Sequence, residues 1–239
     1  MDNKFSTEGL RNFFNAYAEK TYYVRTPVSE DIRGADWEYS KIYTKSLVAG
    51  ITTSAEMTDI LTRRGIVGPE FEQRSNELSL ELGMKINALE NSVSSEEKAT
   101  LAYEVAKARD VLFQWTQRLN QPLSNTCEQI SDDARLEYLT SRLIVDDTGT
   151  CIWADYDKYL HEKNQSLAQQ SKFEVMLYLQ GLDSDFLDKT PEAIAMHELE
   201  AEATLNVEKE LVELSKVILE EAPAEVTALE EPAVKKSKK

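Results

Sequence analysis

Histidine and cysteine are the residue types best suited to acid–base, nucleophilic and metal chemistry, and this chain has only two of each. His161 and His197 are far apart in the sequence, and neither has a neighbour that would orient it as a general base. The stretch that follows His197 lacks the second histidine of a zinc helix. Cys127 and Cys151 also lack the close Cys/His spacing of a zinc site. These residues therefore predict no metal centre and no catalytic site.

Two pairs of aspartates have the D-x-D spacing that begins a calcium loop, namely Asp155 with Asp157 and Asp183 with Asp185. Neither pair continues into the glycine and the final glutamate that such a loop requires. Capping of a helix or formation of a turn is the simpler interpretation of both pairs. The sequence also has no P-loop, no G-x-G-x-x-G and no nucleophile elbow. We therefore expect no enzymatic activity and no cofactor.

The charge of the chain restricts the class of partner. Its formal net charge is −16, from 27 basic and 43 acidic residues. Nucleic acid is disfavoured as a partner, because binding its backbone requires a positive surface. Much of the excess lies in residues 192–231, which hold 12 acidic residues and 2 lysines. No apolar run is long enough to span a membrane, and the first five residues lack the order of a signal peptide. We expect a cytosolic protein with reduced thiols.

Residues 69–119 contain the strongest periodic pattern and predict a long antiparallel helical hairpin. Its second half alternates apolar residues by four and three, the spacing of a coiled-coil seam, and its first half has a matching stripe. The polar run from Asn91 to Glu97 separates the halves. Because the halves have similar lengths, we expect the seam to close mainly on itself. The seam residues are Phe71, Leu78, Leu82, Ile86, Leu89, Leu101, Val105, Ala108, Leu112, Trp115 and Leu119.

Residues 1–35 are predicted to form an aromatic-rich N-terminal arm. Four apolar residues at near-helical spacing predict a short helix, and residues 21–27 are expected to be extended because a proline ends them. So many aromatic side chains need a surface that buries them, which is either the core of the same chain or a neighbouring subunit. Both interpretations stay open. The four residues of the predicted helix are Leu10, Phe13, Phe14 and Tyr17.

Residues 36–68 are predicted to form a pair of helices. The first ends at Gly50, in the manner of a C′ glycine, and the second begins with a capping box of Thr53 and Glu56. A helix pair with this turn is also the pattern of a DNA-binding helix-turn-helix. The second helix, however, has Glu56 and Asp59 near the end that would enter the groove. Simple helix packing is therefore the favoured interpretation.

The rest of the chain is also predicted to be mainly helical. Residues 120–191 form a helical region with one small β-hairpin, in which β-branched runs flank the Asp/Gly turn of residues 146–150. Residues 192–222 form an acidic helix with a thin apolar stripe, typical of a helix that binds a partner or docks lightly on a body. Residues 223–239 are too polar and repetitive to fold, so we expect a disordered tail.

Two stretches resemble a known group of proteins. LSNTCEQISDDARLEYL at residues 123–139 and FEVMLYLQGLD at residues 173–183 are similar to small acidic structural or assembly proteins of T4-like tailed bacteriophages. The resemblance extends loosely over residues 36–192. It implies a virion-associated or tail-assembly protein made in the cytoplasm of an infected bacterium. It includes no catalytic motif, so it transfers no functional residue to this chain.

Together these patterns predict a mainly α fold, with a long antiparallel helical hairpin and a compact helical region that carries one small β-hairpin. We expect a non-enzymatic, chaperone-like phage structural or tail-assembly protein, whose partners are other phage structural proteins or further copies of itself. Two alternatives are a helix-turn-helix regulator and an acidic inhibitor that mimics DNA, which needs its carboxylates on one face. The expected contact residues are Phe13, Phe14, Tyr17, Tyr22, Tyr23, Leu199, Val207, Leu211, Leu214 and Ile218.

Overall fold

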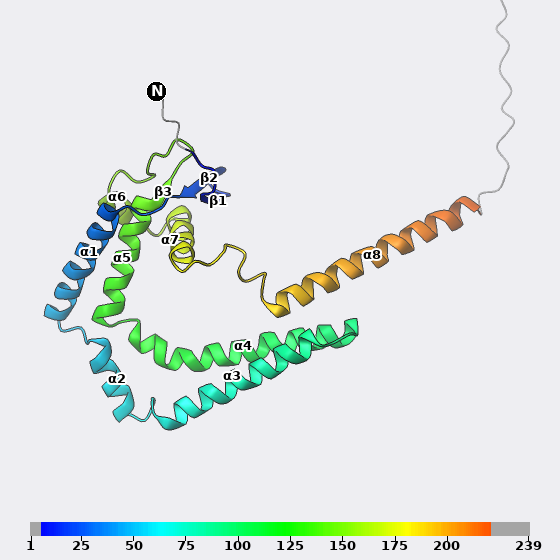
Figure 1. Ribbon diagram of the computed structural model, residues 1–239, viewed down its shortest axis with the longest axis horizontal. Helices are drawn as coiled ribbons and strands as arrows, with labels where there is room; N and C mark the ends of the chain where they lie inside the picture. Colours follow the sequence, from blue (N-terminus) through cyan, green and yellow to red (C-terminus); the bar gives the residue numbers. More distant parts are fainter. Residues whose placement is uncertain (1–5, 221–239) are drawn as a thin grey trace, which may run out of the picture.

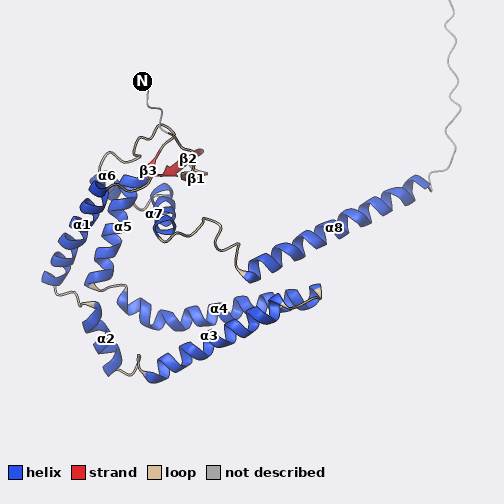
Figure 2. Cartoon of the chain, in the orientation of Figure 1, coloured by secondary structure: helices blue, strands red, loops and turns tan. Residues whose placement is uncertain are grey.

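The chain folds into a helical body from which a long arm projects (Figure 1). The computed structural model describes residues 6–220, with side chains as far as residue 209. It confirms the predicted mainly α class and has one three-stranded antiparallel sheet of order β1-β2-β3 (Figure 2). The elements are β1 (Arg11–Asn15), β2 (Lys20–Val24), α1 (Ser29–Val48), α2 (Ser54–Arg63), α3 (Pro69–Glu90), α4 (Ser95–Leu123), α5 (Cys127–Leu143), β3 (Ile144–Val145), α6 (Tyr156–Glu162), α7 (Ser166–Leu179) and α8 (Pro191–Glu220).

The body is built on α1 and α5, which lie side by side in Figure 1. Gly34 permits their close packing, because a Cβ at this position would lie 2.2 Å from the hydroxyl oxygen of Tyr138 on α5. α6 and α7 also pack on α5. The core of the body includes Trp153 and Tyr159, each 1% exposed, whose rings meet edge to face with their centroids 4.9 Å apart. Residues from Phe13 to Val175 share this core.

The prediction of a short N-terminal helix over residues 10–17 is wrong, because this stretch forms β1 and the turn that follows it. Alternate side chains of a strand face opposite sides of the sheet, so Phe13 is 6% exposed and Phe14 is 59% exposed. The turn contains no glycine, and Glu19 takes the positive φ of 50°. The Asn15 side chain supports the turn by accepting a hydrogen bond of 2.8 Å from a backbone N–H within it.

The predicted β-hairpin of residues 143–153 is present in reduced form, and its first half is also the third strand of the sheet. The Asp146 N–H donates to the Thr150 carbonyl, and the Ile152 N–H donates to the Ile144 carbonyl. β3 pairs antiparallel with β2, in the register Tyr23↔Val145 and Val24↔Ile144. The returning half of the expected hairpin contributes a single bridge, between Val145 and Cys151. A lone two-stranded ribbon is only marginally stable, and pairing with β2 supplies the support that β3 needs.

The predicted pair of helices is present with one change of boundary. α1 begins at Ser29 rather than at residue 36, and Asp31 in its first turn accepts two hydrogen bonds from Arg25, of 2.7 and 2.8 Å. α2 begins with the predicted capping box. The Thr53 hydroxyl accepts a hydrogen bond from the Glu56 N–H, and the Glu56 carboxylate accepts one from the Thr53 N–H.

The arm consists of the predicted hairpin, α3 with α4, together with α8 (Figure 1). Seam residues from both hairpin helices form one hydrophobic cluster, and Ala195 of α8 joins them. α4 continues to Leu123, beyond the boundary expected at residue 119. The cluster consists of Leu82, Ile86, Leu89, Leu101, Ala102, Val105, Ala108, Leu112 and Ala195.

α8 begins against α4 and extends well past the end of the hairpin (Figure 1). The tail predicted over residues 223–239 lies outside the described residues. Between residues 6 and 220, no helix combines the length and the apolar character that crossing a bilayer requires.

Candidate functional site

The aspartates of the two D-x-D pairs contribute to the start of one helix and to one loop. Asp155 caps α6 by accepting a hydrogen bond of 2.8 Å from the Lys158 N–H. Asp183 and Asp185 both pair with Lys189, at 2.6 and 3.0 Å, in the loop that precedes α8. The interpretation as a capping residue is confirmed for Asp155, whereas the side chains of Asp183 and Asp185 form ion pairs within a loop.

The structure does not bring the histidines and cysteines together. His161 lies in α6, and His197 lies in α8 with 64% of its side chain exposed. Cys127 is buried and donates a hydrogen bond of 3.1 Å to the Ile51 carbonyl, and burial raises the pKa of its thiol. Cys151 is a free, half-buried thiol in the segment between β3 and α6. Across the described part of the chain, no three His, Cys, Asp or Glu side chains are grouped as metal ligands.

The arm is the candidate functional site, and an ion pair fixes where its third helix begins. Arg109 of α4 donates two hydrogen bonds to the Glu192 carboxylate, in the first turn of α8. Only 13% of the Glu192 side chain is exposed. Burial alone would raise the pKa of Glu192, but the hydrogen bonds and the positive charge of Arg109 lower it below its ordinary value. Ala195, one turn further along α8, is 6% exposed and packs into the seam.

Two further polar contacts follow α8 to the tip of the hairpin. Lys98 pairs with Glu198 at 3.0 Å, and the Ser95 hydroxyl donates a hydrogen bond of 2.8 Å to Glu202. Ser95 is the first residue of α4. Beyond Glu202, α8 therefore has passed the end of the helix on which it docks.

The part of α8 beyond residue 202 carries apolar side chains that the described structure leaves uncovered. Leu205 and Val207 are 54% and 57% exposed. With 3.6 residues per turn, Val207 lies about 120° around the helix from Ala195, so a longer hairpin would not cover it. In the sequence, apolar residues continue from Val207 at spacings of four, three and four. They are Leu211, Leu214 and Ile218, whose side chains lie outside those described.

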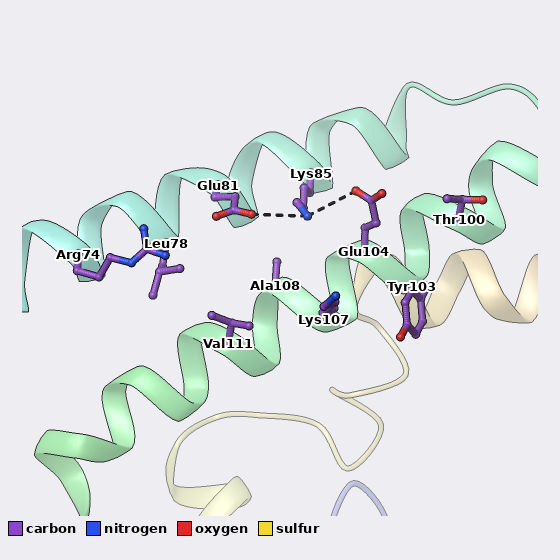
Figure 3. Close-up of a pocket in the computed structure, with 10 residues that line it drawn as sticks. All are labelled: Arg74, Leu78, Glu81, Lys85, Thr100, Tyr103, Glu104, Lys107, Ala108 and Val111. Atoms are coloured by element: carbon purple, nitrogen blue, oxygen red, sulfur yellow. Dashed lines mark ion pairs between the residues drawn. The ribbon is translucent and has the colours of Figure 1, made fainter.

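The opposite face of the hairpin contains an open cavity of about 490 Å³ between α3 and α4 (Figure 3). Its buried apolar residues are Leu78 and Ala108, which are 4% and 9% exposed. Tyr103 and Val111, also on its lining, are 70% and 41% exposed. We call this cavity the open groove. It presents apolar surface on both hairpin helices, and no element among residues 6–220 covers it.

Charged residues border the open groove. Lys85 lies between Glu81 and Glu104, at 3.6 and 3.5 Å, as the dashed lines in Figure 3 show. Arg74, at one end of the groove, pairs with Glu77 at 3.1 Å. Lys107 also lines the groove, and it forms no ion pair with any described residue. The two carboxylates that line the groove therefore share one cationic partner, Lys85.

The predicted contact residues fall into separate groups. Phe13 and Tyr22 are each 6% exposed, with ring centroids 5.9 Å apart in the body's core, so assigning them to a partner surface is wrong. Phe14 and Tyr17 are exposed at 59% and 87%, and Tyr23 is half-buried in β2. In α8, Leu199 is half-buried and Val207 is exposed. The aromatic group therefore belongs to the body and the aliphatic group to the arm.

The structure also bears on the helix-turn-helix alternative. The Glu128 carboxylate of α5 accepts hydrogen bonds from the Ser54 N–H and hydroxyl, at 2.8 and 3.1 Å, at the first residue of α2. The Cys127 N–H donates to the Thr52 carbonyl at 3.0 Å. The start of α2, which would have to enter a DNA groove, is therefore packed against the start of α5 and carries a negative charge.

The residues that receive α8 on the hairpin escaped the sequence analysis. These residues, Ser95, Lys98 and Arg109, are spaced irregularly along α4, and each contacts a glutamate 83 to 107 positions away. The only feature of the sequence that hints at these contacts is the charge of the residues involved. The three glutamates that they contact lie on one face of α8, among residues that the sequence showed only as part of an acidic run.

The sequence matches no protein-family model, and no curated protein or solved structure is significantly similar to it. A functional proposal must therefore be based on the contacts, exposures and charges described above.

Proposed function

We propose that this chain is a non-enzymatic structural or assembly protein that acts through protein–protein contacts made by its arm. The observation that carries the proposal is the uncovered end of α8. The last contact of α8 with the hairpin is made by Glu202. Beyond the hairpin tip, Leu205 and Val207 present exposed apolar surface. Exposed apolar side chains gathered on a projecting element are typical of a surface that another protein covers.

The negative charge of α8 restricts the kind of partner surface that its free end can contact. Its exposed glutamates at positions 200 and 208 lie beside this apolar surface, so the partner surface is expected to combine apolar and cationic groups. The same charge repels a nucleic-acid backbone. An amphipathic helix laid into a groove is a common mode of recognition that uses these features.

The resemblance of residues 36–192 to small acidic proteins of T4-like tailed bacteriophages gives this proposal a setting. In that setting the chain acts in the cytoplasm of an infected bacterium, during tail or virion assembly. Its partners there are other phage structural proteins or further copies of itself. Mass spectrometry of purified phage particles tests whether the chain is incorporated or acts only during assembly.

A photo-crosslinking amino acid at position 207 tests the contact directly. We expect it to form covalent adducts with another protein in producing cells, because Val207 lies on the uncovered surface. Position 48 in α1 provides a matched control, since Val48 is also an exposed valine, at 83%, but lies on the body. Adducts at 207 and few at 48 would support the proposal.

Two results would count against it. Equal adduct yields at positions 207 and 48 would show that the end of α8 is no preferred contact surface. Retention of the purified protein on DNA that disappears as salt is raised would instead favour the nucleic-acid-linked regulator.

A further inference from the structure

We propose that the open groove of the hairpin binds the free end of α8, residues 203–220, from a second copy of this chain. The inference rests on the proposed function, because it names the partner of the same surface. The groove is lined by Arg74, Leu78, Lys85, Tyr103, Lys107 and Val111, among others (Figure 3).

The hairpin already binds α8 of its own chain on the other face. There, cationic side chains of α4 pair with glutamates of α8, and a small alanine packs against the seam. Lys107 and Arg109 are two residues apart on α4, so their side chains lie about 160° apart around the helix. The occupied face and the open groove are therefore the two sides of one hairpin, and both combine an apolar floor with basic residues at the edge.

The charges of the groove and of the helix end are complementary. The lining of the groove holds two carboxylates, Glu81 and Glu104, and three cations, Arg74, Lys85 and Lys107. Lys85 pairs with both carboxylates and offsets one of their two charges, and Lys107 forms no ion pair with a described residue. The free end of α8 carries Glu208 next to the exposed Val207. A helix lying in the groove could place such an apolar residue against Val111 and Tyr103, and its neighbouring glutamate near Lys107.

The dimensions of the two parts agree. On α3 the lining residues run from position 74 to position 85, which spans about 16 Å at 1.5 Å per residue. The free end of α8 has 18 helical residues, or about 27 Å. It is therefore long enough to fill the groove along its whole length.

The occupant must come from another copy, because α8 of the same chain cannot reach the groove. The Ser95–Glu202 contact places α8 at the hairpin tip, and the helix continues outward from there (Figure 1). A straight helix that leaves the tip on one face cannot turn back along the opposite face. Contact between a helix end and a groove joins two different surfaces, so each copy retains one of each, and association continues into a ring or an open chain.

Sedimentation of the full-length chain over a range of concentrations tests the proposal. We expect the mass to rise above that of one chain, and to fall to one chain in either of two variants. Lys107→Glu reverses the charge of the groove, and Val207→Asp places a charge on the helix end, and each is expected to weaken association about tenfold or more. Leu80→Asp is the matched control, because Leu80 is 66% exposed on α3 and does not line the groove.

Mixing the two variants tests whether the helix end of one copy meets the groove of another. Lys107→Glu retains an intact helix end and Val207→Asp retains an intact groove. An equimolar mixture should therefore form pairs of chains that cannot extend. A wild-type chain that remains a monomer, association unaffected by both variants, or a mixture that stays monomeric would overturn the inference. If adducts at position 207 contain only a different protein, the proposed function survives and this inference fails.

Discussion

Arg109 and Glu192 join α4 to α8 across 83 positions of sequence, through two hydrogen bonds to one carboxylate. With Ala195 they fix the register in which α8 leaves the hairpin. The contacts that hold α8 come chiefly from α3 and α4, and not from the body. Docking of α8 is therefore a property of the arm, which can be changed without unfolding the rest of the chain.

Replacing Arg109 by alanine should loosen α8 on the hairpin. The pair is partly exposed, so its loss is expected to cost about 1 kcal/mol, and amide hydrogen exchange across residues 191–202 should become several-fold faster. Exchange in α1 and α5 should not change. Arg118→Ala is the control, because Arg118 is another arginine of α4 but lies over the Trp115 ring of the same helix, at 4.4 Å, instead of pairing with Glu192. Unchanged exchange in residues 191–202 would show that the ion pair does not hold the helix.

Acid should also release α8, because the pKa of Glu192 in the folded chain lies below its ordinary value of 4.5. A carboxyl group with a lowered pKa stabilises the docked state above pH 4.5, and this contribution is lost as the pH falls through the lower folded value. The protection factors of the amide hydrogens in residues 191–202, corrected for the intrinsic slowing of exchange in acid, should therefore fall below pH 4.5. Glu192→Gln should weaken docking at neutral pH and remove much of this pH dependence. An unchanged acid response in that variant would assign it to other carboxylates.

The buried pair of Asp31 with Arg25 should be far more important for stability than a surface pair. Asp31 is 3% exposed, and although burial alone would raise its pKa, hydrogen bonds from Arg25 and the Val28 N–H lower it. Asp31→Asn leaves the guanidinium without its charged partner, at an expected cost of about 3 kcal/mol in urea unfolding.

Asp59→Asn provides the comparison, because Asp59 pairs with Arg63 on the exposed surface of α2. Its removal should change the free energy of unfolding by less than about 0.5 kcal/mol. Similar losses in the two asparagine variants would mean that the burial of Asp31 adds nothing to the strength of its ion pair.

Features that depend on neighbouring residues could be predicted from the sequence. The capping box of Thr53 and Glu56 needs only a spacing of three, and the hairpin seam needs only a regular alternation of apolar residues. Both are present as expected. The docking of Ala195 into that seam is different, because small residues on an acidic helix give no signal of what they pack against.

The N-terminal strands show why other parts could not be predicted. The spacing of Leu10, Phe13, Phe14 and Tyr17 fits a helix, yet β2 pairs on its second side with β3, from residues more than a hundred positions later. Tertiary pairing therefore overrode the local pattern. The contact of Arg109 with Glu192 could not be predicted for the same reason, because the two residues are far apart in the sequence. Without this contact, the docked face of α8 could not be distinguished from its free face.

Two glycines that lie within helices should respond to alanine in opposite directions. A Cβ at Gly34 would meet the Tyr138 ring at 2.2 to 2.7 Å, whereas nothing lies within 4 Å of a Cβ at Gly83 in α3. Gly34→Ala should therefore destabilise the chain by about 1–3 kcal/mol through overpacking between α1 and α5. Gly83→Ala should stabilise α3 by up to about 1 kcal/mol, because alanine is the better helix former.

Urea unfolding of both variants provides the measurement, and Tyr138→Ala provides the control for mechanism. Combining it with Gly34→Ala removes the obstructing ring, so the double variant should be more stable than the sum of the two single losses predicts. Additive losses would show that the helices separate rather than clash. A destabilised Gly83→Ala would show that α3 is covered at that position in solution, by a surface that the single chain does not supply.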